Sequence, residues 1–185
     1  MIIRLLLVLI AVLAGARAVP AAAAAAVDVS IRRDGDAVLI EASATLRADT
    51  ATAWHVLTDY DRYADFIPGL RASRVIAREG AVVTVEQSGD APVWLLRMPL
   101  DVTYEIAEYP PYRLRSRATA SSLRALDSSY VLTPIAGGVR LAYAGRLAPR
   151  RAVLGRIEQY AARQSIVRDF QALADEIERR SAKQK

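Results

Sequence analysis

Cysteine is absent from the 185-residue chain, and histidine occurs once, as His55. Without cysteine the chain has no lipobox, disulfide framework or thiol nucleophile. A zinc site would have to consist mostly of carboxylates, which is uncommon, so we expect neither a metal nor a cofactor. Stability must therefore come from packing, and a hydrophobic fraction of 53% provides enough apolar surface for one core.

The N-terminal region has the pattern of a secretory signal peptide. A short positive start containing Arg4 precedes the apolar run "LLLVLIAVLAGA", and small residues suited to signal-peptidase cleavage follow. Arg17 interrupts the apolar run well short of the roughly 20 residues of a spanning helix, which disfavours the alternative of a membrane anchor. We expect residues 1–26 to be a signal peptide and residues 27–185 to be one exported domain, periplasmic or secreted.

Cleavage after residue 26 also changes the charge. Removing 26 of the 185 residues leaves 159, and the loss of Arg4 and Arg17 lowers the formal charge from +5 to +3. A protein that is only mildly basic and exported is a poor candidate for nucleic-acid binding. We therefore expect no nucleic-acid partner.

Hydrophobic periodicity predicts a hairpin followed by two short helices. Asp34-Gly35 is a hairpin turn signal, and "DAVLIEASATLRA" alternates apolar with polar residues, as a strand with one buried face does. Asp49-Thr50 and Thr58-Asp59 can each cap a helix, and Pro68-Gly69 ends the second one. The stretch "WHVLTDYDRYADFIPGL" thus reads as two consecutive short helices.

From Leu70 onward the period changes to two, which predicts five or six antiparallel strands because no crossover helix separates them. Apolar residues alternate strictly from Trp94 to Ile106 on one expected face, where Pro99 requires an edge position, a bulge or a break. Tyr112 and Leu114 are expected to point inward on the next strand. The last segment returns to a helical period and predicts one long amphipathic helix.

Three residues of the helical stretch are candidates for chemistry. His55 could act as a general base or ligand, but a lone histidine without an identifiable partner is more often structural. Asp59 and Asp61 fit the local roles of cap and turn residues better than those of a catalytic pair. Trp54 and Tyr63 are most simply anchors that join the helices to the sheet. We therefore identify no catalytic residue.

The order of elements resembles a known superfamily. The segments "AWHVLTDYDRYADFIPGL", "VTYEIAEYPPYRLRSRAT" and "SSYVLTPIAGGVRLAYAGRL", with the helix that follows, are similar to the START-like (SRPBCC) polyketide cyclases and dehydrases, and within them to the coenzyme-Q-binding group. The resemblance spans about residues 38 to 179. It implies an α+β helix-grip fold, in which a curved antiparallel sheet wraps a long C-terminal helix, with two short helices after the first long strand.

The resemblance also implies an elongated apolar cavity between the sheet and the terminal helix. Periodicity alone leaves two alternatives, because the large inward side chains can either fill a solid core or line a cavity. With the resemblance, the interpretation is an exported carrier of a hydrophobic small molecule, a lipid or isoprenoid quinone. The expected ligand-binding residues come from one short helix, the sheet and the terminal helix: Phe66, Trp94, Leu96, Met98, Tyr104, Tyr130, Tyr143, Ile166 and Phe170.

Two other functions stay open at this point. A cyclase or dehydrase would use tyrosines, His55 or an aspartate inside the cavity to orient and deprotonate a polyketide-like substrate. An interaction module would instead present a sheet edge or a basic stripe to another envelope protein. The arginines that define this stripe, Arg113, Arg115 and Arg117, fit a solvated strand face, or a surface that makes transient contact with an anionic membrane.

Overall fold

The computed structural model describes residues 25–93, 96–121, 124–148 and 156–184. A hairpin leads into three short helical segments, six further strands and a long C-terminal helix. The elements are β1 (Val27–Asp34), β2 (Ala37–Leu46), α1 (Thr50–Leu57), the 3-10 helix η1 (Tyr60–Arg62), α2 (Tyr63–Phe66), β3 (Leu70–Glu79), β4 (Val82–Val93), β5 (Leu96–Tyr109), β6 (Arg113–Ser121), β7 (Ala125–Ile135), β8 (Gly138–Ala148) and α3 (Arg156–Ala182).

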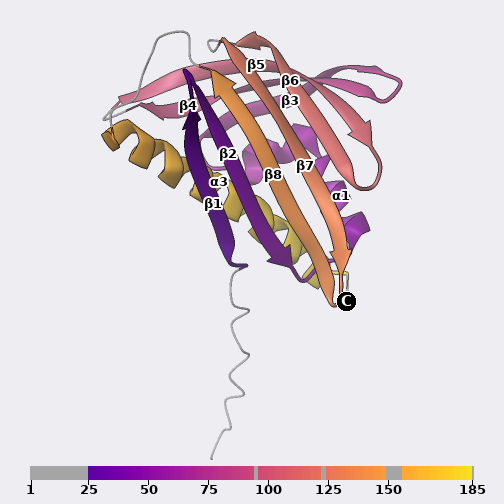
Figure 1. The fold of residues 1–185 in the computed structure, drawn as a ribbon. Helices are drawn as coiled ribbons and strands as arrows, with labels where there is room; N and C mark the ends of the chain where they lie inside the picture. Colours follow the sequence, from indigo (N-terminus) through magenta and orange to yellow (C-terminus); the bar gives the residue numbers. More distant parts are fainter. Residues whose placement is uncertain (1–24, 94–95, 122–123, 149–155, 185) are drawn as a thin grey trace, which may run out of the picture.

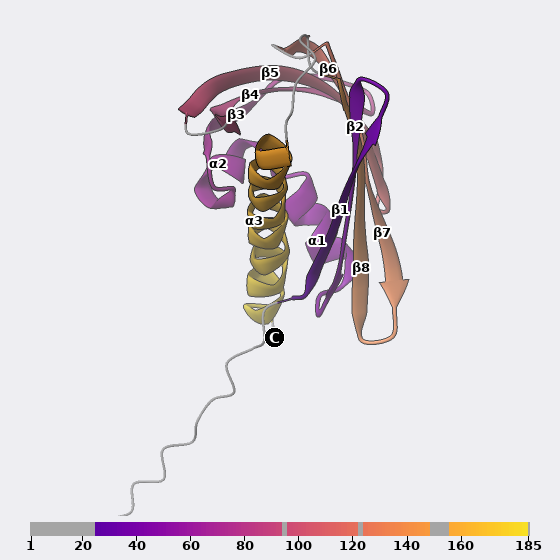
Figure 2. The same ribbon diagram turned by 60° about the vertical axis from the view of Figure 1, so that its left-hand side comes forward.

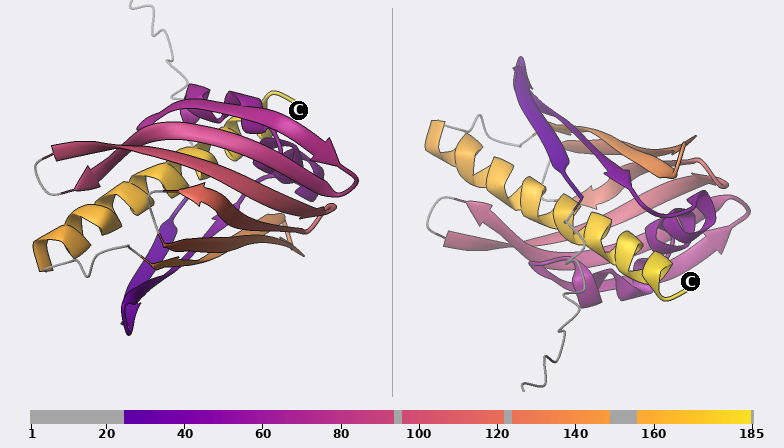
Figure 3. Two further views of the ribbon diagram at one scale, coloured as in Figure 1. Left: turned by 90° about the horizontal axis from the view of Figure 1, so that it is seen from above. Right: turned by 90° about the horizontal axis from the view of Figure 1, so that it is seen from below.

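The strands of the described chain form one antiparallel sheet of eight, in the order β1-β2-β8-β7-β6-β5-β4-β3. Consecutive hairpins join β3 to β8, and β2 returns to pair with β8. The sheet curves strongly, and α3 lies along its concave side together with α1 and α2 (Figures 1 and 2). Views from above and from below show that α3 crosses the concave side of the sheet (Figure 3). The predicted helix-grip α+β fold is confirmed.

Local sequence explains the helical segment after β2. The Asp49 side chain accepts a hydrogen bond from the Thr52 amide at 2.6 Å and caps α1, as the sequence predicts. Gly69 follows α2 with φ of 86°, a left-handed conformation that glycine adopts without strain, and the chain then enters β3. The predicted cap at Asp59 is wrong, because Asp59 precedes η1 without a capping hydrogen bond.

The sheet also decides the alternatives left open for Pro99. Pro99 pairs with Asp90 of β4, whereas the described pairing of β5 with β6 begins only at Val102. Pro99 therefore occupies an edge position, where a missing amide donor breaks no ladder. Tyr112, which we expected to point inward, is 50% exposed, because it lies in the turn before β6 and not within that strand.

The main core lies between the sheet and α3. Leu46, Leu132 and Leu141 from the sheet are almost fully buried, as are Leu173 and Ile177 on α3. Both α3 residues belong to the apolar stripe that the helical period predicts. No helix in the described ranges has the length and apolar character required to cross a membrane.

Candidate functional site

A cavity of about 320 Å³ lies between the concave face of the sheet and the middle of α3. It is bounded by the α2–β3 turn, by six strands and by one face of α3. Its lining residues are Ile40, Ile67, Pro68, Gly69, Leu70, Gln87, Gly89, Asp90, Val102, Tyr104, Leu126, Tyr143, Leu147, Ser165, Ile166 and Asp169. Mostly apolar walls with a few convergent polar groups are typical of small-molecule sites.

Wider hollows elsewhere on the molecule differ in character. One of about 520 Å³ is lined by side chains such as Arg74, Glu86 and Asp101, which point away from the concave face. The residues that line this groove all come from β3, β4, β5 and β6, and none of them belongs to α3. The cavity beside α3 is therefore the candidate site.

Three tyrosines approach this cavity from the sheet. Tyr104 on β5 and Tyr143 on β8 line it, and Tyr130 on β7 packs against Tyr143 with ring centroids 4.9 Å apart. Tyr143 leans over Gly145, where an added Cβ would come within 2.4 Å of its hydroxyl oxygen. Glycine at position 145 thus lets the Tyr143 ring lie flat along the strand.

Burial raises the pKa of all three phenols, so they are neutral hydrogen-bond donors at neutral pH. A hydrogen bond with Ser128 opposes this rise in the pKa of Tyr143. Among the described residues, the hydroxyls of Tyr104 and Tyr130 have no hydrogen-bond partner. Both side chains are partly exposed, so their hydroxyls can donate to water or to a ligand.

Asp169 on α3 faces the tyrosines from the other wall. Burial raises the pKa of its carboxyl group, and the neighbouring Arg168 guanidinium, at 3.1 Å, opposes that rise. Arg168 also donates to the Pro68 carbonyl at 3.4 Å and to the Ser165 hydroxyl at 3.1 Å. It thereby ties α3 to the α2–β3 turn at the rim of the cavity.

The structure places the nine predicted ligand-binding residues in three groups. Tyr104, Tyr143 and Ile166 line the cavity, whereas Tyr130 and two aromatic core residues lie beside it. These two are Phe66, whose ring centroid is 5.5 Å from that of Tyr63, and Phe170, which is 5% exposed. Trp94 and the side chains of Leu96 and Met98 lie outside the described residues. Ligand contact by all nine stays a prediction.

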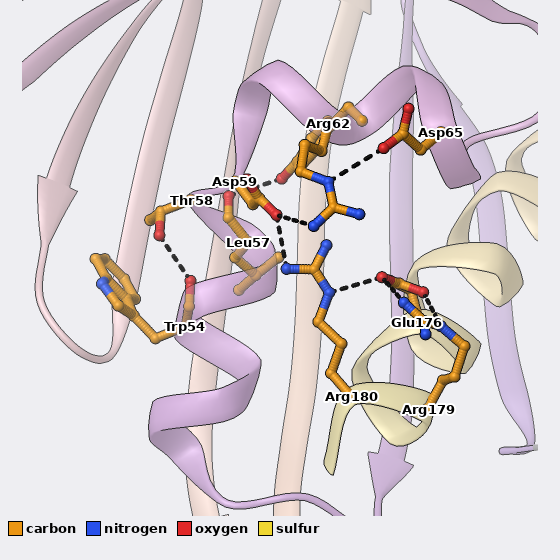
Figure 4. A network of polar contacts seen from close by, with 10 residues as sticks. Trp54, Leu57, Thr58, Asp59, Arg62, Asp65, Glu176, Arg179 and Arg180 are labelled. Atoms are coloured by element: carbon orange, nitrogen blue, oxygen red, sulfur yellow. Dashed lines mark hydrogen bonds and ion pairs between the residues drawn. The ribbon is translucent and has the colours of Figure 1, made fainter. Parts of the chain in front are cut away.

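The polar residues of the helical stretch take structural positions. The Asp59 carboxylate accepts from Arg180 at 2.6 Å, and Arg180 also donates to Glu176 at 2.6 Å (Figure 4). Arg179 forms two further hydrogen bonds with Glu176, so this charge cluster connects the short helices to α3. Hydrogen bonds from Arg179 and Arg180 lower the pKa of the Glu176 carboxyl group to about 2, although burial of this group acts in the opposite direction.

The two other candidates of this stretch lie away from the cavity lining. Asp61 accepts a hydrogen bond from the Val75 amide of the edge strand β3 at 2.7 Å. This bond satisfies a donor at a strand edge that would otherwise be free to pair with another chain. His55 is exposed on α1. The structural interpretation therefore fits both residues.

Sequence reasoning missed the polar residues Gln87, Asp90, Ser165 and Asp169 of the lining. Asp169 had one available signal, because it follows Ile166 by three positions and so shares its helix face. No comparable signal identifies Gln87 or Asp90, whose positions depend on strand register. Within the described ranges, no group of three or more histidine, cysteine, aspartate or glutamate residues could hold a metal ion.

The fold and the cavity together define a helix-grip domain with a ligand site between sheet and helix. The sequence model of the family described as polyketide cyclase/dehydrase and lipid transport matches residues 37–182. The chain belongs to this family. It is thus a START-like domain of a family that binds hydrophobic small molecules, in either lipid transport or polyketide cyclisation. A search of curated protein sequences found no match.

Solved structures share the fold at low sequence identity. A protein of Thermus thermophilus has 14% identity and a TM-score of 0.66, with 80% of this chain and 99% of that chain covered. The Zhui aromatase/cyclase from Streptomyces sp. R1128 has 17% identity and a TM-score of 0.61, covering 80% and 95%. A STAR-related lipid transfer protein from Xanthomonas axonopodis has 15% identity and a TM-score of 0.57, covering 80% and 98%.

Proposed function

We propose that this protein is an exported carrier that holds a hydrophobic small molecule, a lipid or isoprenoid quinone, in the cavity between the sheet and α3. The observation that carries the proposal is the mostly apolar cavity itself, in a chain of a lipid transport and cyclase family. Burial in such a cavity replaces membrane contact for the ligand, and this is the main contribution to binding.

Native mass spectrometry of the protein purified from its own cell envelope tests this proposal. We expect a stoichiometric adduct, and organic extraction should release a lipid or quinone. Ile166→Phe places a larger side chain in the cavity wall and should reduce the adduct, whereas Gln164→Phe on the exposed side of the same helix should leave it unchanged. Protein that is empty from the envelope and takes up no lipid in vitro would contradict carriage.

The export part of the proposal rests on the N-terminal pattern. We expect the protein to be recovered from the periplasm or medium, with an N-terminus close to Val27 where β1 begins. Cell fractionation measures the location of the protein, and N-terminal sequencing of the recovered protein measures the cleavage site. Recovery of the uncleaved chain in the cytoplasm would refute export.

Delivery to a membrane is proposed to involve the outer face of β6. Arg113 and Arg115 are exposed without an ion-pair partner among the described residues, whereas Arg117 pairs with Asp127 at 3.1 Å. We expect Arg115→Ser to weaken sedimentation with phosphatidylglycerol vesicles more than Arg140→Ser, which removes the same charge from the outer face of β8. Equal binding of both variants would argue against this surface.

A second candidate is a cyclase or dehydrase-type enzyme. It is favoured by one observation, the convergence of Tyr104, Tyr143 and the partly buried Asp169 on one cavity. Proton transfer requires such groups near the substrate. Turnover of an aromatic polyketide precursor that is lost in Asp169→Asn would support this function, and tight binding without turnover would support carriage.

A further inference from the structure

We infer that β1 is an interaction edge at which two copies of this domain pair their sheets, with Ser30 of each copy on the twofold axis. β1 is the last strand at one end of the sheet and has β2 as its strand neighbour (Figure 1). It precedes residues 37–182, the part of the chain that the family model matches. The described lining of the cavity beside α3 contains no residue of β1, so ligand binding does not account for this strand.

The two edges of the sheet differ in how they are protected against pairing with another chain. On β3 the register with β4 shifts twice, and the Val75 amide donates to the Asp61 carboxylate. The short helices η1 and α2 also lie against β3. Bulges, satisfied edge groups and covering segments are the usual means by which a protein blocks pairing at a sheet edge. The β3 edge is therefore closed to a further strand.

The β1 edge is regular instead. Its eight residues pair with β2 without a register shift, so their backbone offers evenly repeated N–H and C=O groups to a further strand. Arg163 of α3 donates to the Val29 carbonyl at 3.3 Å, but a carbonyl oxygen can accept a second hydrogen bond. The backbone of β1 is therefore a template for one more antiparallel strand.

The charges on β1 select a second copy of this chain as the partner. In an antiparallel pair centred on Ser30, Asp28 of each copy lies opposite Arg32 of the other, on the exposed face of the sheet. Asp28 forms no ion pair among the described residues. Arg32 contacts Glu41 at 3.5 Å, and both side chains are exposed, so the guanidinium can also reach a second carboxylate. The symmetric pair thus gains two contacts between opposite charges.

Neighbouring registers fit less well. With Ile31 on the axis, Asp28 lies opposite Asp34, so like charges meet. With Val29 on the axis, Arg32 lies opposite no residue of β1. An axis between two residues would place exposed side chains opposite inward ones. The charge pattern of the strand therefore specifies one register.

Sedimentation velocity with charge-reversed variants tests this inference. One edge strand buries little apolar surface, so we expect a reversible wild-type dimer whose population rises with protein concentration. Asp28→Arg and Arg32→Asp each place like charges opposite one another and should raise the dissociation constant by about tenfold or more. An equimolar mixture of these two variants should dimerise again, because one copy then has two positive side chains at the contact and the other has two negative ones.

Glu105→Arg and Arg115→Asp are the matched controls, since both residues are exposed on strands far from β1 in the sheet order. Each should dimerise as the wild type does. A wild-type protein that is monomeric at every concentration would overturn the inference. A dimer that persists unchanged in Asp28→Arg and Arg32→Asp, or a mixture that stays monomeric, would refute pairing through β1.

A cross-link at the axis measures the register directly. The chain has no cysteine, so Ser30→Cys introduces a single thiol. Directly opposite residues of antiparallel strands have Cα atoms about 4.5–5.5 Å apart, within the roughly 4.4–6.8 Å that a disulfide spans. Oxidised Ser30→Cys should migrate as a dimer on a non-reducing gel, whereas Thr45→Cys, at an exposed position of β2, should stay monomeric. Equal cross-linking of the two variants would contradict the assigned axis.

Discussion

Replacing Glu176 by glutamine tests how strongly the charge cluster beside α3 stabilises the fold. Glu176 accepts hydrogen bonds from Arg179 and Arg180, at 2.6 to 2.7 Å, and its side chain is only 7% exposed. Arg180 in turn reaches Asp59 before η1, so Glu176 holds the arginine that joins the two parts of the chain. Glutamine has a similar shape but no charge, so the variant removes the electrostatic part of the contact.

The magnitude follows from the pKa of Glu176, which falls from 4.5 to about 2 in the folded protein. At about 1.4 kcal/mol per pKa unit, this shift corresponds to roughly 3 kcal/mol. Arg179 is 47% exposed, and solvent screening of its pair with Glu176 reduces the expected loss in Glu176→Gln to about 2 kcal/mol. For a domain of this size, the melting temperature should fall by about 4–8 °C.

The pH dependence gives a sharper test than the size of the loss. Because the folded pKa lies below the unfolded one, the glutamate contributes its full stabilisation above pH 4.5 and loses it as the pH falls toward 2. The difference in unfolding free energy between wild type and Glu176→Gln should therefore shrink across this range. Urea unfolding followed by circular dichroism at several pH values between 7 and 2.5 measures it.

Glu105→Gln provides the control, since Glu105 is exposed on β5 and forms no ion pair among the described residues. Its stability should follow that of the wild type at every pH. A difference for Glu176→Gln that stays constant from pH 7 to 2.5 would refute the electrostatic reasoning. So would a control that loses as much as the test variant.

Three further substitutions test individual contacts by urea unfolding. Asp49→Ala removes the cap of α1 and should cost about 1 kcal/mol. Asp61→Ala should cost about 1 kcal/mol and speed hydrogen exchange of the Val75 amide, because that donor loses its acceptor. Gly145→Ala should cost about 1–3 kcal/mol and weaken ligand binding, because the new methyl group displaces Tyr143. An unchanged stability in any of the three would contradict the contact that it tests.

Much of the fold could be predicted because its signals are local. In β2 the residues Ile40, Ala42 and Leu46 are buried and alternate with polar residues, so the period alone identifies the strand and its inward face. The pairing that closes the sheet could not be predicted in this way. Ile40 lies opposite Gly145 of β8, and no periodic pattern specifies which of several amphipathic strands takes that place.

The site was predicted less completely, because periodic patterns do not specify which distant elements pack together. Tyr104 and Tyr143 are large residues on inward strand positions, so their approach to the cavity could be read from alternation. Asp169 looks like one more charged residue of a surface helix until α3 is packed against the Pro68 turn. Asp59 looked like a cap because its partner, Arg180, is 121 residues away in the sequence.

The tyrosines show how the same side chain divides between structure and binding. Tyr60 is 2% exposed, and its hydroxyl reaches Glu108 on β5, a carboxylate that accepts the hydrogen bond and fixes the ring in the core. Tyr104 lies two positions from buried Val102 on that same strand, yet its hydroxyl meets no described acceptor and borders the cavity. The buried phenol of Tyr60 has a partner and restricts the fold, whereas the partly exposed phenol of Tyr104 can donate to water or to a ligand. Affinity of the proposed carrier would therefore come mainly from the apolar wall of the cavity.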